Sequence, residues 1–454
     1  MILTDKVLEI YKEHSICPYC LGRMFSLLAT NTTNIERGNS ILLTITMQLH
    51  KKYLSKIGTD FDTVVTNLKN LAERAKYLPA RMVLKNEGLD FSSEYDEEKC
   101  YLCQDIFTNL NKYAESAKKE LENYEYDNLL VGTNLNAGIV NREDTFKANY
   151  EILESESFKS HFNREVGKIL TQRVNKPTEF NNPDITVIFS LNYDSFTIDL
   201  LIRSLFIYGK YQKLIRGIPQ THWDCRKCRG SGCEACNNTG KQYPTSVEEL
   251  ISPKFKEASK SINSKFHGAG REDIDVRMLG DGRPFIIELK NPVLRSLDLK
   301  KLKKNVNKKN KKRIKIDNLR YSSKSEVKQI KFKSEVVKKK YRALIESPNL
   351  PLSKEIFLLM EKKIIDQTVG KKIYQKTPQR VSHRRADKIR EKKIFNIKGT
   401  FLKPSLFEFI IETQGGTYIK ELITGDEGRT RPSFSEIFET PLICKELDVI
   451  HIGL

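Results

Sequence analysis

Four closely spaced cysteine pairs constrain this chain more than any other feature of its sequence. Eight of its nine cysteines occur as Cys-x-x-Cys, and only Cys444 is single. The first residues carry acids early and contain no apolar core segment, so we expect no signal peptide and place the protein in the cytoplasm. In that compartment paired thiols bind metal more often than they form disulfides.

The pairs divide into two candidate zinc sites. The first consists of Cys17, Cys20, Cys100 and Cys103. Each pair can supply two ligands from one tight turn, so one structural zinc ion would join the N-terminal helix to a later element; the alternative is two unrelated pairs of buried cysteines. The second consists of Cys225, Cys228, Cys233 and Cys236, in the short loop CRKCRGSGCEACNNTGK. We expect this loop to close on one zinc ion, and the alternative is a redox-active pair.

Charge is concentrated in one segment. The net charge is +20, and residues 300–340 hold 18 lysines and arginines against three acids. A polyanion is therefore the first partner to consider. We expect the Lys/Asn-rich residues 300–333 to form a mobile basic loop that grips a phosphate backbone. We expect no membrane partner, because no apolar run approaches the roughly 20 residues that a membrane span needs.

The remaining patterns predict a two-domain α+β protein. Residues 184–206 alternate β-branched and aromatic residues around a turn at 192–194, which predicts two strands. The cysteine-rich loop marks a domain boundary near residue 245. Ser246 and Glu249 then form the N-terminal signature of a helix. The later strand-like runs do not alternate regularly with helices, which favours α+β over a doubly wound sheet.

Three carboxylates stand among glycines and arginines in HGAGREDIDVRMLG (267–280). By themselves they indicate loop charges. Three later segments change that interpretation: KKKYRALI, whose tyrosine could stack on a base; QKTPQRVSHRRADKIR, a basic element with a turn; and QGGTYIKELI, where a lysine on a strand-like run could pair with an aspartate. Each alone is compatible with an ordinary strand or surface, but together and in this order they indicate a site.

These segments resemble those of the THUMP-bearing tRNA pseudouridine synthases of archaea and eukaryotes, in the pseudouridine synthase superfamily. The resemblance is strongest over residues 267–445 and extends to the paired cysteines of the N-terminal half. It implies a zinc-containing, THUMP-like RNA-binding domain over residues 1–245. It also implies a catalytic domain over residues 246–454, with a mixed or antiparallel central sheet and the basic loop at 300–340.

The resemblance implies an activity and its residues. Uridine 54, uridine 55 or both, in the T-arm of tRNA, would become pseudouridine without any catalytic cofactor or nucleotide, on a uridine flipped out of its stack. The catalytic residue would be Asp273, with Asp275 as the alternative register. The substrate-binding residues would be Tyr341, which stacks on uracil, Lys420, which pairs with the aspartate, Tyr418 and Arg271. We expect a monomer, and the alternative function is a non-catalytic zinc-containing RNA-binding or RNA chaperone protein.

Overall fold

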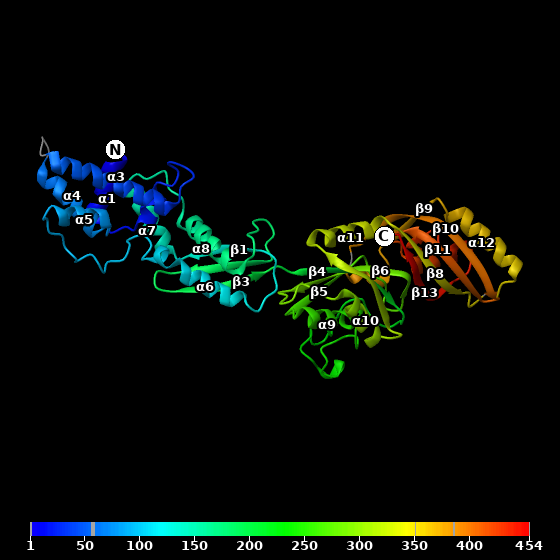
Figure 1. The fold of residues 1–454 in the computed structure, drawn as a ribbon. Helices are drawn as coiled ribbons and strands as arrows, with labels where there is room; N and C mark the ends of the chain where they lie inside the picture. Colours follow the sequence, from blue (N-terminus) through cyan, green and yellow to red (C-terminus); the bar gives the residue numbers. More distant parts are fainter. Residues whose placement is uncertain (1, 56–59, 350, 385, 454) are drawn as a thin grey trace. The chain divides into compact units, whose positions relative to one another are not determined.

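The computed structural model describes residues 2–55, 60–349, 351–384 and 386–453 (Figure 1). The chain divides into two compact units, Met1–Arg203 and Ser204–Leu454. The expected boundary near residue 245 therefore lies inside the second unit. The reason is β4 (Leu205–Lys213), which precedes the cysteine-rich loop and pairs along its length with β6 (Arg277–Lys290) of the sheet in that unit.

Helices form the first half of the N-terminal unit. They are α1 (Leu3–Glu13), α2 (Pro18–Met24), α3 (Asn34–Ser55), α4 (Phe61–Glu73) and α5 (Leu78–Asn86). The amphipathic α1 buries Val7, Ile10 and Tyr11. α2 crosses α3 so closely that a Cβ on Gly22 would lie 1.8 Å from the carbonyl oxygen of Asn34, so only glycine fits there. In the described ranges, no helix of either unit has the length and apolar character that crossing a bilayer requires.

A three-stranded sheet with helices forms the second half of this unit. The elements are η1 (Ile106–Asn109), α6 (Leu110–Leu121), β1 (Leu129–Leu135), α7 (Ala137–Asn149), α8 (Phe158–Val174), β2 (Ile185–Leu191) and β3 (Phe196–Ile202). β2 runs parallel to β1 and antiparallel to β3, so the two strands predicted within 184–206 are confirmed. Phe189 of β2 packs against Phe162 of α8, with the ring centroids 5.5 Å apart.

One large sheet forms the core of the C-terminal unit. Besides β4 and β6 it contains β5 (Asn263–Gly268), β7 (Ile314–Ser322), β8 (Lys338–Glu346), β9 (Lys372–Lys376), β10 (Ile389–Lys403), β11 (Leu406–Gln414), β12 (Thr430–Arg431) and β13 (Ile443–Ile452). The order is β12-β9-β10-β11-β8-β13-β6-β4-β7, with β5 paired to β6. β13 runs parallel to β6 and antiparallel to β8. The predicted α+β class with a mixed sheet is therefore confirmed.

Helices pack on both faces of this sheet around β4 and β6 (Figure 1). On one face, α9 (Val247–Ser259) and α10 (Leu299–Lys309) bury Phe255 and Val306 in a core cluster with Ile207 of β4. On the other face, α11 (Lys324–Val336) packs Ile330 against Ile286 of β6. Alternate residues of the strands thus face two different helical layers.

The basic segment 300–333 is ordered, and the expectation of a mobile loop is wrong. It forms most of α10, all of β7 and most of α11. Leu302 and Val306, four residues apart, are buried, and the Asp298 side chain caps α10 by accepting a hydrogen bond from the Lys301 main-chain nitrogen at 2.9 Å. Two apolar residues at helical spacing are enough to fix one face of a short helix, and the surrounding lysines hide this pattern in the sequence.

The segment around Lys420 is a helix rather than the expected strand. Gly416 has a φ of +78°, which turns the chain after β11 into α13 (Ile419–Thr424). Lys420 therefore projects from the first turn of a helix.

The cap predicted for α9 is confirmed, since Ser246 Oγ accepts a hydrogen bond from the Glu249 main-chain nitrogen at 3.2 Å. The remaining elements are η2 (Glu234–Cys236), α12 (Lys354–Thr368), η3 (Gln379–Arg384) and α14 (Phe434–Ile437).

Candidate active site and cysteine clusters

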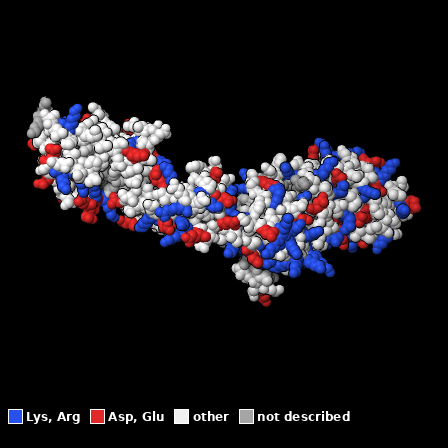
Figure 2. Space-filling view, viewed as in Figure 1, with Lys and Arg blue, Asp and Glu red and all other residues white. Residues whose placement is uncertain are grey.

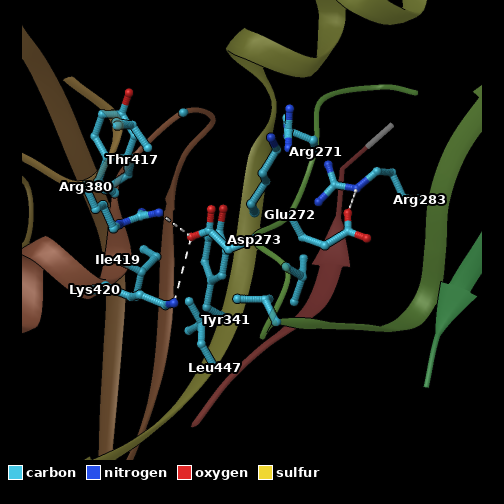
Figure 3. Close-up of a pocket in the computed structure, with 16 residues that line it drawn as sticks. Arg271, Glu272, Asp273, Arg283, Tyr341, Arg380, Thr417, Ile419, Lys420 and Leu447 are labelled. Carbon is cyan, nitrogen blue, oxygen red and sulfur yellow. Dashed lines mark hydrogen bonds and ion pairs between the residues drawn. The ribbon is translucent and has the colours of Figure 1, made fainter. Parts of the chain in front are cut away.

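A pocket in the C-terminal unit contains most of the side chains that the sequence singled out (Figure 3). Its volume is about 140 Å³, close to the engineered cavity of about 150 Å³ that binds one benzene ring. Its walls come from the loop before β6 and from β8, η3, α13 and β13, and they include Asp273, Tyr341, Arg380, Tyr418, Lys420 and Leu447. The pocket therefore has room for one planar ring beside charged groups.

Asp273 faces two cations that come from separate elements. Arg380 Nη1 lies 2.8 Å from Asp273 Oδ2, and Lys420 Nζ lies 4.0 Å from the same oxygen (Figure 3). The Asp273 side chain is 31% exposed, so its carboxylate is only partly shielded from solvent. Two positive charges at these distances stabilise a negative charge on Asp273. The predicted pairing of Lys420 with Asp273 is present, but Arg380 is the closer partner.

Asp275 lies beside the pocket and shares Lys420 with Asp273. Lys420 Nζ donates hydrogen bonds to both Asp275 oxygens, at 2.6 and 2.7 Å. Burial acts to raise the pKa of Asp275, but the hydrogen bonds and charge of Lys420 outweigh it, and the pKa lies below its ordinary value. The side chain is 64% exposed and is not among the described residues that line the pocket.

A buried ionic network holds the loop that carries Asp273. Glu272 accepts hydrogen bonds from Arg283 Nε at 2.8 Å and from the Tyr211 hydroxyl at 2.9 Å. Lys213, also buried, donates from Nζ to the main-chain carbonyl of Asp273 at 3.0 Å, and burial lowers its pKa. Removing one partner would leave a buried charge uncompensated, so the network strongly favours one loop conformation. Glu272 thus anchors the loop while Asp273 faces the pocket.

Tyr341 and Tyr418 are the aromatic residues of the pocket. Tyr341 lies on β8 and is buried, and burial raises its pKa to about 12, so its hydroxyl is protonated at neutral pH. Tyr418 immediately precedes α13 and is held by Gln375, whose side-chain amide exchanges two hydrogen bonds of 2.9 Å with the Tyr418 main chain. Leu447 and Val449 of β13 add apolar surface. The pocket therefore has charged groups along one edge and aromatic and apolar side chains along its walls.

Arg271 connects the pocket to the cysteine-rich loop. It lines the pocket, and its guanidinium carbon lies 5.3 Å from the ring centroid of Trp223, within the range of a cation–π contact. Trp223 in turn packs edge-on against Tyr243, with the centroids 5.7 Å apart. These two aromatic residues lie on either side of the loop in the sequence, so the base of the loop contacts a residue of the pocket wall.

The four cysteines of the N-terminal unit form one cluster, in which Cys17 is partly buried and the other three are buried. All Sγ atoms of Cys17, Cys20, Cys100 and Cys103 lie within 4.8 Å of one another, and those of Cys17 and Cys103 are 3.8 Å apart. Four sulfurs bound about 2.3 Å from Zn²⁺ in a tetrahedron are about 3.8 Å from one another. The spacing therefore fits a single tetrahedral metal ion, and the alternative of two unrelated pairs is wrong.

The second cluster has similar dimensions but a different setting. Contacts between the sulfurs of Cys225, Cys228, Cys233 and Cys236 measure 3.7–3.9 Å. These distances far exceed the roughly 2.05 Å of a disulfide bond and again fit a tetrahedral ion. The main-chain nitrogens of Cys233 and Gly240 each donate a hydrogen bond of 3.3 Å to Cys236 Sγ, which stabilises a thiolate there. Three of these four cysteines are only partly buried.

Sequence reasoning missed Arg380 and the buried network. Arg380 lies in QKTPQRVSHRRADKIR, where nothing distinguishes it from the neighbouring arginines; in the structure its Nε also bonds Glu421 Oε1 at 2.5 Å. The burial of Lys213, by contrast, could be inferred from the sequence. This residue follows Ile207 and Tyr211 at the period-two spacing of the buried face of β4, so a buried lysine could have been inferred once that strand was assigned.

Two family models match the chain. Residues 113–190 match the model described as the archaeal Pus10 THUMP domain, and residues 206–453 match the one described as the C-terminal part of Pus10. The second match begins near the division between the two structural units. The class of protein is therefore the predicted one, a pseudouridine synthase domain preceded by a THUMP domain.

Full-length relatives agree with this class. A tRNA pseudouridine synthase Pus10 of Methanocaldococcus jannaschii is 42% identical, with 98% of this chain and 93% of the relative covered. The Methanothrix thermoacetophila protein of the same name is 38% identical over 99% and 94% of the two chains. The chain belongs to the Pus10 family of tRNA pseudouridine synthases. A solved Cbf5-Nop10-Gar1 complex is similar over 46% of this chain and 45% of the other at 15% identity, but its TM-score of 0.28 supports no argument.

Proposed function

We propose that this protein converts uridine to pseudouridine in the T-arm of tRNA, with Asp273 as the reacting carboxylate. The observation that carries the proposal is the position of Asp273, which faces a ring-sized pocket next to Arg380, Lys420 and Tyr341. The family and the names of the relatives support the reaction and tRNA as its substrate. Asp275 is less suited than Asp273 to be the reacting carboxylate, because its side chain is more exposed and lies beside the pocket.

In the proposed reaction Asp273 acts as nucleophile or base on a flipped-out uridine. The N-glycosidic bond breaks, the uracil rotates in the pocket, and its C5 atom forms a carbon–carbon bond to the sugar. The C5 proton leaves and N1 gains a proton, so the product is an isomer and no other reactant is consumed. Tyr341 stacks on the uracil, Tyr418 contacts the substrate, and Lys420 and Arg380 hold the carboxylate ready.

The RNA outside the pocket would be held by several groups. Arg271 can bind the phosphate of the flipped nucleotide, since a guanidinium forms strong charge-assisted hydrogen bonds with phosphate. The THUMP region at 113–190 would grip the acceptor end, as such regions do in other tRNA-modifying enzymes. We infer uridine 54, uridine 55 or both as the targets from the family resemblance.

Structural zinc is the metal that best fits both cysteine clusters. Each offers four thiol ligands at tetrahedral spacing, and a site with four protein ligands has no open position for substrate or water. Zinc bound there would stabilise the fold and take no part in the isomerisation.

The proposal is tested by replacing each aspartate in turn. We expect Asp273→Asn to lower kcat by at least about 10³-fold, as removal of a catalytic nucleophile does in other enzymes. Asp275→Asn, a matched loss of one negative charge in the same loop, should keep kcat within about tenfold of wild type, since it removes no reacting group. Pseudouridine is mapped in a T-arm transcript, and binding of the same RNA is measured for each variant.

The opposite ranking of the two variants would make Asp275 the catalytic residue. If the wild-type protein binds tRNA but forms no pseudouridine in any tRNA, the alternative of a non-catalytic RNA-binding or chaperone protein is correct.

A further inference from the structure

Residues 299–316, the basic surface, carry ten lysines and arginines and no aspartate or glutamate. They comprise α10, the turn after it and the start of β7. Nine of the ten cationic residues are exposed, and the tenth, Lys303, is intermediate. Figure 2 shows Lys and Arg side chains gathered where Figure 1 places α10. Ten cationic residues are therefore displayed together on one ordered surface of the C-terminal unit.

Few acids compensate this surface. Lys303 pairs with Asp317 at 3.0 Å, just beyond its edge. Within α10, Lys300, Lys304 and Lys308 follow one another at four-residue spacing, where like charges destabilise a helix. On α12, by contrast, the lysines share their helix with Glu355, Glu361 and Asp366. A bound polyanion would relieve the repulsion along α10.

We propose that the basic surface binds the phosphate backbone of RNA outside the reacting nucleotide. This inference rests on the proposed function in taking tRNA as that RNA. Lys300 and Lys308 lie about 12 Å apart along the helix axis, a length over which a duplex carries roughly seven phosphates. Because Leu302 and Val306 anchor α10 in the core, binding needs no ordering of a loop.

The chemistry of the surface favours RNA backbone over other acidic partners. Nine of its ten cations are lysines, which act as point charges toward phosphates, whereas arginine provides the two-pronged contacts typical of base recognition. None of its described residues is a large exposed hydrophobic residue, and insertion of a helix into a lipid surface needs such residues. Recognition here is therefore electrostatic and independent of sequence.

The test neutralises four lysines, Lys300, Lys304, Lys308 and Lys311, to glutamine, which preserves side-chain bulk and helix propensity. The probe is an unmodified tRNA transcript with the full-length protein. We expect the Kd for tRNA to rise at least about tenfold at physiological salt, and the slope of log Kd against log salt to decrease by up to about four, one for each lost phosphate contact. The kcat at saturating tRNA should stay unchanged, because the surface holds no pocket residue.

The matched control neutralises four exposed lysines in and just after α12, Lys354, Lys362, Lys363 and Lys371, and changes the net charge equally. Unchanged binding in the control supports the proposal. Equal weakening in both variants would mean a general charge effect and overturn it, as would wild-type affinity in the α10 variant. Lysine-dependent binding to phosphatidylserine vesicles with unchanged tRNA affinity would also overturn it. A further outcome separates the two proposals. If the α10 substitutions weaken tRNA binding but the wild-type protein makes no pseudouridine, the basic surface binds RNA as proposed and the proposed function is wrong.

Discussion

The two cysteine clusters use the same chemistry in opposite settings. In the N-terminal unit the pairs are distant in sequence and their sulfurs meet in the core, with Cys20 and Cys103 fully buried. In the C-terminal unit all four cysteines lie in one short loop and three are partly exposed. A metal ion bound in the first cluster would join elements far apart in the chain, whereas one bound in the second would order a surface loop. The same motif would thus stabilise a whole unit in one place and fix the shape of a single loop in the other.

The largest expected effect concerns the buried cluster. In Cys103→Ser we expect the N-terminal unit to lose several kcal/mol of stability, since structural zinc contributes about 10–16 kcal/mol to small zinc domains and one of four ligands is removed. Thermal unfolding and limited proteolysis should show loss of that unit, and the bound zinc should fall from two ions to one. The C-terminal unit should resist proteolysis as before. An unchanged unfolding profile would show that this cluster does not stabilise the unit.

A second effect concerns acid sensitivity near the buried cluster. His161 is 1% exposed and stacks on Phe107 at 4.2 Å, and burial lowers its pKa to about 3. The charges that act on it are Arg23, Glu156, Arg164 and Lys168. In the unfolded chain the pKa of His161 is near 6.5. Below that pH the unfolded state therefore binds a proton that the folded state does not bind. Stability present above pH 6.5 is thus lost on acidification, by roughly 2 kcal/mol at pH 5.

Urea unfolding of wild type and His161→Phe at pH 7 and pH 5 measures this contribution. Acid also affects groups that the two proteins share, so the informative quantity is the difference between their free energies of unfolding, which should shrink or reverse at pH 5. A difference that is independent of pH would show that His161 is protonated in the folded state.

The smallest effect concerns the exposed cluster. Cys233→Ser should change the free energy of unfolding by about 1 kcal/mol or less, because its cluster lies in a partly exposed loop and joins no distant elements of the core. It should nevertheless disturb Trp223, the only tryptophan of the sequence, and through it Arg271. We expect a shift in tryptophan fluorescence and a few-fold higher KM for tRNA at unchanged kcat. If this variant unfolds as Cys103→Ser does, the contrast between the clusters is wrong.

Much of the fold and site could be predicted because the informative residues carry local patterns. Period-two alternation gave the strands β2 and β3, the Ser246 cap gave the start of α9, and the paired spacing gave both cysteine clusters. The resemblance supplied Asp273, Tyr341, Tyr418, Lys420 and Arg271, and the structure brings all five to one pocket. Their roles in catalysis stay predictions.

The rest depended on interactions between distant residues. Segment α10 is ordered because two apolar side chains of its sequence are buried. The ten cations around them make this apolar spacing hard to recognise in the sequence. The turn of α13 depends on a glycine with positive φ, which a strand-like reading of TYIK overlooks. The unit boundary at Ser204 follows from pairing between β4 and a strand some 70 residues later, and no local signal marks such a pairing.

The cations of the pocket are each held by a second carboxylate. Arg380 contacts Glu421 as well as Asp273, and Lys420 contacts Asp275 as well as Asp273. If Asp273 lost its negative charge by bonding to the sugar, as one form of the proposed reaction requires, each cation would still have a counter-ion. In the proposed reaction Glu421 and Asp275 would therefore keep Arg380 and Lys420 in place while the charge of Asp273 changes, so that the pocket keeps its shape through each turnover.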